Sequence, residues 1–204
     1  FLDHAFRQNL STAACRNELW SVSSLGWQSS LSQIAAIQPV GTDETRAQAL
    51  ARWRAFGPWV DQEIANLQEG LRLGYLATEA ATQSTLKQLD AMLTEAPGES
   101  SLMDPATRDG TPAFAAEWKE VVAGTVWPAL TRYRDFLRDK YVAHARKSPS
   151  LDGMPGGREC YRAMAFAITT VDADPEQLFE RARQQIEREH RVALDLGRKL
   201  YGDK

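Results

Sequence analysis

The sequence predicts an all-α protein: a multi-helix bundle with one long kinked helix and a Pro/Gly-rich loop. Two observations predict this class. Apolar residues recur at a spacing of three to four through most of the 204 residues, as on the buried face of a helix. Alternating β-branched residues are confined to Ile168–Val171, which is too short to seed a sheet. Short connections between successive helices favour antiparallel packing, and hence a bundle.

We expect residues 1–204 to form a single helical domain, because a chain of this length can bury one sizeable core. The sequence starts at Phe1 without the charged-then-apolar pattern of a signal peptide. We therefore expect it to be a segment of a larger protein.

The first helix is predicted over residues 19–37, with a flexible point at Gly26. A turn at Pro39–Gly41 follows it, and Thr42 or Asp43 can cap the next helix. The apolar residues of the first helix are expected to face the core: Leu19, Val22, Leu25, Leu31, Ile34 and Ile37.

The next two predicted helices meet at Gly57-Pro58. Pro58 suits the first turn of a helix, where the missing amide proton needs no helical acceptor, and this helix continues to about Leu73. The inward residues expected before the junction are Ala47, Leu50, Trp53 and Phe56. Those expected after it are Val60, Ile64, Leu67 and Leu71.

The middle of the chain is predicted to hold a helix, a connection and a long helix. Residues 79–95 form the first of these. Residues 96–101 and 104–112 form the longest non-helical connection, with a loop at Asp109-Gly110. The long helix runs from 113 to about 147. Pro128 should kink or reset it, because proline removes a helical hydrogen bond. The face of the 79–95 helix is formed by Leu86, Leu89 and Leu93.

A Pro/Gly-rich loop and one more helix complete the prediction. Residues 148–161 contain two prolines and three glycines, which cannot continue a helix. The last helix starts with Asp174 as cap, Pro175 in the first position and Gln177 in the third, and it ends near Gly202.

Composition argues against several classes of protein. Hydrophobic residues make up 43% and charged residues 25%, which is ordinary for a globular protein. The net charge of −3 comes without a basic block, so binding to nucleic acid is not expected. No apolar run approaches the roughly 18 residues of a transmembrane helix. Cys15 and Cys160 are too few for a disulfide framework or a structural zinc site. We expect two buried free thiols, with a single bridge as the alternative.

The histidines do not predict a metal site. A His-Glu-x-x-His pair would place two imidazoles one turn apart beside a carboxylate, and His4, His144 and His190 do not form one. Glu187 and His190 match one half of a bundle di-iron site, but that chemistry needs two such pairs. Flanking arginines make a solvated ion-pair face the better interpretation.

Nucleophile and anion sites are also not indicated. No Gly-x-Ser-x-Gly elbow occurs, and Gly153–Gly157 lacks the Lys-Ser/Thr of a phosphate loop. Alternating arginines and aspartates over 132–139 predict an ion-paired surface. The tryptophans lie at helical intervals among aliphatic residues, so core packing is the expected role of Trp20, Trp27, Trp53, Trp59, Trp118 and Trp127.

Several segments resemble the bacterial family catalogued as domain of unknown function 885. The similar segments are Asn17–Trp20, Gly26–Gln28, Gln38–Gly41, Arg46–Trp53, Ile64–Tyr75, Gln88–Asp90, Asp104–Gly110, Arg132–Tyr141 and Gly156–Tyr161. The chain departs from the family pattern at Gln68 and at Leu76–Thr78, which weakens any role of that turn in substrate contact.

The resemblance implies a function that the residues alone do not. The family is similar to helical zinc carboxypeptidases, and many members are exported and lipid-anchored. It implies that this chain forms one wall of a substrate cleft in an exported or periplasmic protein. No cofactor is expected in this chain; zinc and the catalytic residues would come from the missing C-terminal half of the longer parent. The chain alone is then expected to be inactive. The alternative is a non-catalytic helical interaction module, whose partner is that missing half or a second copy.

Within this interpretation Gly156, Gly157 and Tyr161 are the candidates for contact with a peptide-like substrate. Glycines let a backbone approach a ligand closely, and Tyr161 offers an aromatic surface with a hydroxyl at its edge. The alternative is that Met154–Tyr161 only connects two helices, with Tyr161 in the core.

Overall fold

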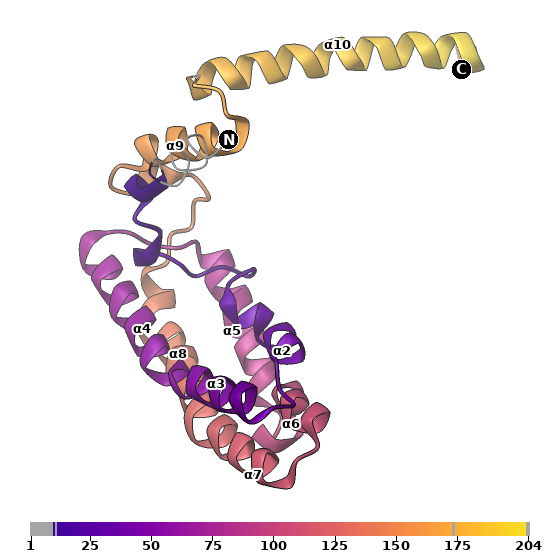
Figure 1. Ribbon diagram of the computed structural model, residues 1–204. Coiled ribbons are helices and arrows are strands. Elements are labelled where there is room, and N and C mark those ends of the chain that lie inside the picture. The colour runs from indigo at the N-terminus through magenta and orange to yellow at the C-terminus, as the bar shows by residue number, and fades with distance from the viewer. Residues whose placement is uncertain (1–9, 11, 173, 203–204) are drawn as a thin grey trace. The chain divides into compact units, whose positions relative to one another are not determined.

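The computed structural model describes residues 10, 12–172 and 174–202 (Figure 1). These residues form helices and no strand, and a single isolated bridge pairs Thr78 with Arg146. The predicted all-α class is therefore confirmed. The α-helices are α2 (Trp27–Ile37), α3 (Asp43–Arg54), α4 (Phe56–Leu73), α5 (Glu79–Leu93), α6 (Asp104–Asp109), α7 (Pro112–Val121), α8 (Trp127–Phe136), α9 (Gly157–Thr169) and α10 (Pro175–Tyr201).

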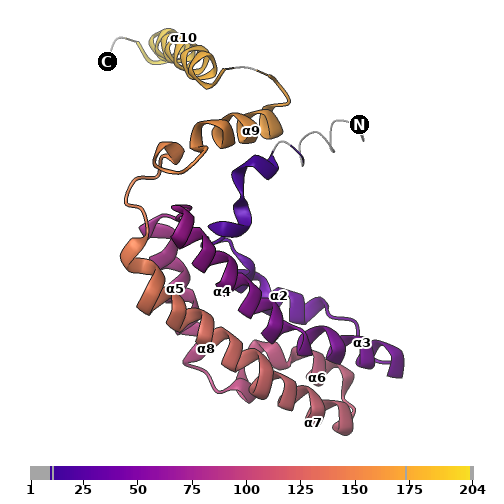
Figure 2. The ribbon, with the colours of Figure 1, turned by 90° about the vertical axis from the view of Figure 1, so that its left-hand side faces the viewer.

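The chain groups into two compact units. The core unit is Asn17–Pro155, and the flanking unit combines Phe1–Arg16 with Gly156–Lys204. The single domain expected over 1–204 stays a prediction, since two compact units can still fold as one domain. In the core unit α8 packs against α4 and α5, and α7 packs against α3 and α6 (Figure 2). Trp118, Tyr133 and Tyr141 are the largest side chains that this packing buries fully.

The start of the first predicted helix was wrong. Asn17–Leu19 forms a single 3₁₀ turn, and α2 begins only at Trp27, with Gly26 as its N-cap. Serine-rich residues before Gly26 favour turns over helix: the Ser23 carbonyl accepts hydrogen bonds from the Gly26 amide and from Nε2 of Gln28. The helix therefore presents a different face to the core than expected. It buries Gln28, Leu31 and Ala35 and leaves Ile34 and Ile37 exposed. Leu25, which precedes the helix, is also exposed.

The junction between α3 and α4 lies earlier than expected. Thr42 caps α3 in a reciprocal capping box with Thr45, as one of the two predicted caps. Only Ala55 separates α3 from α4, so Gly57 and Pro58 lie inside the first turn of α4, where an amide proton is not needed. Ala47 is exposed and Ala49 takes its predicted place in the core.

The expected connection at 96–112 is mostly helical. Two 3₁₀ turns, Pro97–Glu99 and Ser101–Met103, lead directly into α6. Each proline here occupies the first or second position of a helical segment, where it is tolerated. The predicted turn at Asp109-Gly110 is present, and Gly110 ends α6 with a left-handed φ of 71°.

The long helix expected from 113 to 147 is present and interrupted near Pro128, as predicted. A π turn at Val122–Val126 separates α7 from α8, and Pro128 is the second residue of α8. The wider π turn relieves the clash between a proline ring and the carbonyl four residues earlier. A second π turn at Leu137–Tyr141 and a 3₁₀ turn at Val142–His144 end this segment.

The last predicted helix is confirmed as α10. The Asp174 side chain accepts a hydrogen bond from the Glu176 amide, Pro175 takes the first position, and Gly202 follows the C-terminal end. The helix is amphipathic in sequence but buries none of its described side chains.

Gly70 permits a close approach between two backbone segments of the core unit. A Cβ built on Gly70 would lie 1.9 Å from the Leu19 carbonyl oxygen, so the 3₁₀ turn at Asn17–Leu19 can sit on α4 only when this residue lacks a side chain.

Gly70→Ala is expected to lower the free energy of unfolding by about 2 kcal/mol or more, because backbone must move to admit the methyl group. Denaturant unfolding measures this change. Gly124→Ala is the matched control, since a Cβ there meets nothing within 4 Å; its stability should be unchanged or higher by up to about 1 kcal/mol. Equal effects of the two substitutions would contradict the close approach.

Candidate functional site

The predicted substrate-contact residues lie at the start of α9. Gly156 is the N-cap, with a left-handed φ of 63°, and Gly157 is the buried first residue of the helix. The loop expected to continue to Tyr161 therefore ends at Gly156, because the two glycines provide the turn and the residues after them favour helix. Tyr161 lies in the first turns of α9 and is 54% exposed, so the alternative that places it in the core is wrong. Contact of these three residues with substrate stays a prediction.

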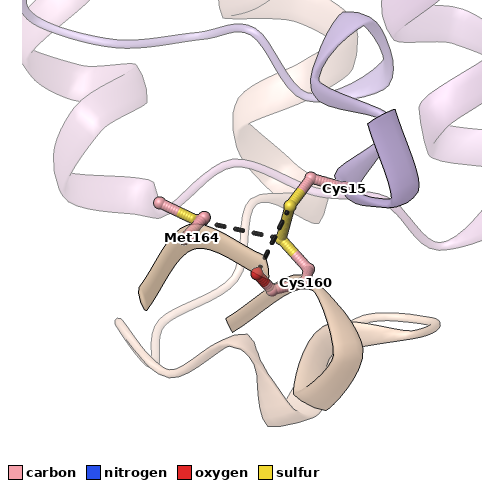
Figure 3. Close-up of a disulfide and its surroundings, with 3 residues drawn as sticks. All are labelled: Cys15, Cys160 and Met164. Carbon is pink, nitrogen blue, oxygen red and sulfur yellow. Dashed lines mark hydrogen bonds between the residues drawn. A yellow bond between two sulfur atoms is a disulfide. The ribbon is translucent and has the colours of Figure 1, made fainter. Parts of the chain in front are cut away.

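A disulfide between Cys15 and Cys160 anchors this region (Figure 3). Both cysteines belong to the flanking unit and are buried, with Cα atoms 4.6 Å apart. The Cys160 Sγ also lies 3.8 Å from the Met164 Sδ on the next turn of α9. The expectation of two free thiols was wrong, because cysteines separated by 145 residues give no local signal of pairing. The bond fixes the residue that directly precedes Tyr161.

The histidines do not come together in the described parts of the chain. His144 and His190 are exposed on different segments, and His4 lies outside the described residues. Among residues 10, 12–172 and 174–202, no group of three or more His, Cys, Asp or Glu side chains could hold a metal ion. The solvated ion-pair face predicted near His190 is confirmed, since Arg183 pairs with both Glu180 and Glu187.

The arginine and aspartate residues of α8 and the turn after it also pair as predicted. Arg134 binds Asp90 and Asp135, and Arg138 binds Asp135 and Asp139. These hydrogen bonds lower the pKa of Asp139 from its usual value, chiefly through Arg138. The surface is therefore neutralised internally and offers no concentrated charge for an anion.

Two tyrosines, Tyr133 and Tyr141, are buried in the core unit. The Ala77 amide donates a 2.8 Å hydrogen bond to the Tyr141 hydroxyl. Burial raises the pKa of Tyr141 and, together with the nearby charge of Glu63, that of Tyr133. Ser21 donates a 3.0 Å hydrogen bond to this Glu63 carboxylate. Both phenols therefore stay protonated near neutral pH.

An aromatic pocket opens on the core unit. Its volume is about 230 Å³. Residues of three helices line it: Trp27, Leu31 and Ile34 of α2, Arg52 and Trp53 of α3, and Phe56 and Trp59 of α4. Arg52 is the single charged residue of this lining.

Aromatic rings pack edge to face around the pocket. The Trp27 ring centroid lies 5.1 Å from that of Trp59 and 5.6 Å from that of Phe56, with interplanar angles of 83° and 74°. Such edge-to-face contacts are favourable beyond the area that they bury. Three of the lining rings, those of Trp27, Phe56 and Trp59, therefore support one another.

Core packing was the expected role of the six tryptophans, and the pocket was missed. Trp53 and Trp118 are buried as expected, but Trp59 is 42% exposed. The available signal was the three-residue spacing of Trp53, Phe56 and Trp59, which continues one aromatic stripe across the junction between α3 and α4.

The family model for bacterial proteins of unknown function (DUF885) matches residues 2–204. This chain belongs to the DUF885 family. A search of curated proteins finds no match for the sequence. The resemblance found in the individual segments is thus confirmed for the family itself.

The fold is similar to that of a solved bacterial protein. A crystal structure described as the "putative lipoprotein" from Colwellia psychrerythraea superposes with a TM-score of 0.79 at 14% sequence identity. The alignment covers 91% of this chain and 34% of the Colwellia chain. The DUF885 chain described here therefore spans about a third of the length of that protein. Within its described residues, no helix is long and apolar enough to cross a membrane.

Replacing Cys15 and Cys160 by serine is expected to destabilise the flanking unit by about 2–5 kcal/mol, as loss of a native disulfide does in small domains. Thermal unfolding followed with and without a thiol reductant measures the effect. The reductant should lower the midpoint temperature of unfolding of the unsubstituted chain and leave that of the double variant unchanged. Two titratable thiols in the unreduced, denatured parent would contradict the bond.

Proposed function

We propose that this DUF885 chain is the substrate-binding, metal-free part of a longer exported protein, and that the start of α9 forms one wall of its substrate cleft. The observation that carries the proposal is Tyr161: an exposed aromatic side chain that follows the disulfide-bonded Cys160 and a glycine turn. A fixed backbone with an exposed phenol suits contact with a bound chain, because little entropy is lost when the ligand arrives.

Three observations support the remainder of the proposal. The chain spans 34% of the Colwellia protein, which leaves room in a longer relative for catalytic residues outside this segment. The name of that protein as a lipoprotein favours export. The Cys15–Cys160 disulfide favours it independently, since disulfides persist mainly in oxidising compartments.

The reaction class rests on the resemblance to helical zinc carboxypeptidases. On this basis we propose a peptide-like substrate and a zinc ion held by the longer protein outside the present chain. The contribution of this chain is to bind and orient: Tyr161 contributes ring surface and one hydroxyl, and Gly156 and Gly157 leave the turn before it free of side chains.

Tyr161→Phe in the longer protein tests the hydroxyl. We expect peptidase kcat/KM to fall about fivefold, the effect of losing one neutral hydrogen bond, while the helical circular dichroism signal is unchanged. Tyr201→Phe is the matched control, because Tyr201 is an exposed tyrosine on α10 and its substitution should leave kcat/KM unaltered. Gly157→Val tests the glycine turn and should reduce turnover further.

The proposal fails if these Tyr161 and Gly157 variants fold normally and turn over substrate at the parental rate. Metal analysis of the longer protein tests the reaction class separately: one zinc per chain is expected there and none in the isolated 204 residues. Stoichiometric zinc in the isolated chain, lost on substitution of one histidine, would contradict the assignment.

A second function is favoured by α10: a non-catalytic interaction module. This helix buries none of its described side chains, and its exposed residues include Phe179, Ile186 and Leu200. These side chains give α10 an exposed apolar surface. Contiguous surfaces of this kind mark interaction sites in soluble proteins.

Light scattering on the isolated chain tests the interaction module. If α10 binds a second copy, the unsubstituted chain should be dimeric at micromolar concentration, and the Ile186→Lys variant should be monomeric. Gln184→Lys adds the same charge to the same helix at a polar exposed position and should leave the dimer intact. This function would be excluded if the unsubstituted chain is monomeric and binds no apolar dye.

A further inference from the structure

The size of the aromatic pocket in the core unit limits what it can hold. Its volume of about 230 Å³ exceeds the roughly 150 Å³ of an engineered cavity that binds benzene. It is smaller than the roughly 300–1,000 Å³ of pockets for drug-sized ligands. One ring with a short substituent, or one branched aliphatic group, therefore fills it.

The walls of the pocket are held in place without a ligand. Nε1 of Trp53 donates a 3.3 Å hydrogen bond to Oε1 of Gln38, and the Trp53 ring lies 5.3 Å from that of the buried Trp118. On α2, the Trp27 ring centroid lies 4.9 Å from that of the buried Tyr133. Binding therefore does not require these rings to be ordered first, which reduces its entropic cost.

The rim exposes apolar surface to water. Trp59 is 42% and Ile34 is 38% exposed, although both are large apolar side chains at the mouth of a preformed hollow. An apolar ligand group that covered them would remove this surface from water, which is favourable in proportion to the area buried.

Arg52 is a solvent-exposed residue of the lining whose charge is not paired with a carboxylate. Nη1 of Arg52 donates a 3.2 Å hydrogen bond to the neutral amide of Gln38, and no ion pair involves Arg52 within the core unit. Most other arginines of this unit bind carboxylates, as in the pairs made by Arg46, Arg54, Arg72, Arg108, Arg132, Arg134 and Arg138.

Arg146 is the remaining arginine of the core unit, and it is satisfied by backbone. Its guanidinium donates hydrogen bonds to the carbonyl oxygens of Leu76, Ser148 and Ser150. Arg52 is thus a cation beside an apolar pocket. Apart from the N–H group that binds Gln38, the donors of its guanidinium have no protein acceptor. A guanidinium binds carboxylates in a planar, two-bond geometry that a neutral group cannot match.

We infer that this pocket is a binding site for a small apolar carboxylate: a single ring or branched aliphatic group joined by a short linker to an anionic carboxylate. The apolar group occupies the hollow between Trp27, Phe56 and Trp59, and the carboxylate accepts hydrogen bonds from Arg52. This site is separate from the proposed function, which rests on Tyr161 and uses no residue of the pocket.

Two sources can supply this chemistry: a free apolar acid, or the free C-terminus of a peptide that ends in an apolar residue. Both present a carboxylate within a few bonds of one apolar group. The probes below separate the two.

The test is to titrate the isolated chain with 3-phenylpropionate and with its neutral amide, 3-phenylpropanamide, following tryptophan fluorescence and calorimetry. We expect the acid to bind about tenfold more tightly than the amide, the difference that a charge-assisted hydrogen bond provides. Arg52→Met should lower the affinity for the acid to that for the amide and leave the amide unaffected. A short blocked peptide ending in free phenylalanine, and its C-terminal amide, form the second pair of probes.

Arg54→Met is the matched control. Arg54 lies on the same helix but pairs with Glu117 and does not line the pocket, so its substitution should leave acid binding unchanged. Trp59→Ala removes an exposed wall and should weaken both acid and amide, with the folded state verified by circular dichroism. Salt should weaken acid binding and not amide binding.

Selective binding of the acid, the peptide acid or both supports the inference and identifies the source. Equal affinity of acid and amide, no binding of any probe at millimolar concentration, or equal losses in Arg52→Met and Arg54→Met would overturn it. None of these outcomes depends on peptidase activity, so a failure here is distinct from a failure of the Tyr161 proposal.

Discussion

Buried Gln38 links three helices of the core unit through its side chain and its backbone carbonyl, and the arrangement around it depends on these contacts. Gln38 directly follows α2; its Oε1 accepts hydrogen bonds from Arg52 and Trp53 of α3. Its backbone carbonyl accepts a 2.8 Å hydrogen bond from Arg108 of α6. A buried amide without partners would cost free energy, so these helices hold one relative position. In that position α2 and α3 both contribute side chains to the aromatic pocket.

Features set by neighbouring residues were predictable from the sequence. The caps at Thr42 and Asp174 and the left-handed turn at Gly110 depend on side chains and φ preferences within a few residues. The interruption near Pro128 follows from its missing amide proton. Apolar periodicity identified most helices but gave the wrong face of α2, because the position of a helix on the core is decided by partners far away in sequence.

The candidate site was only partly predictable for the same reason. The glycine turn before α9 was visible in the composition of 148–161, whereas the exposure of Tyr161 depends on how α9 packs. The pairing of Cys15 with Cys160 and the pocket lined by Arg52 both join residues from separate segments. In each case the residues carry no local signal of their association, and only the fold brings them together.

The disulfide makes the core unit an insertion. Residues 17–155 leave and re-enter the flanking unit between two segments that Cys15 and Cys160 bind covalently, so the backbone from 15 to 160 is a closed ring. A single proteolytic nick within this ring would leave both fragments attached to one another until the bond is reduced. During synthesis from the N-terminus, Cys15 emerges long before its partner. The ring can therefore close only after the whole core unit has been made. A closed ring shows that synthesis has passed Cys160, near the start of α9.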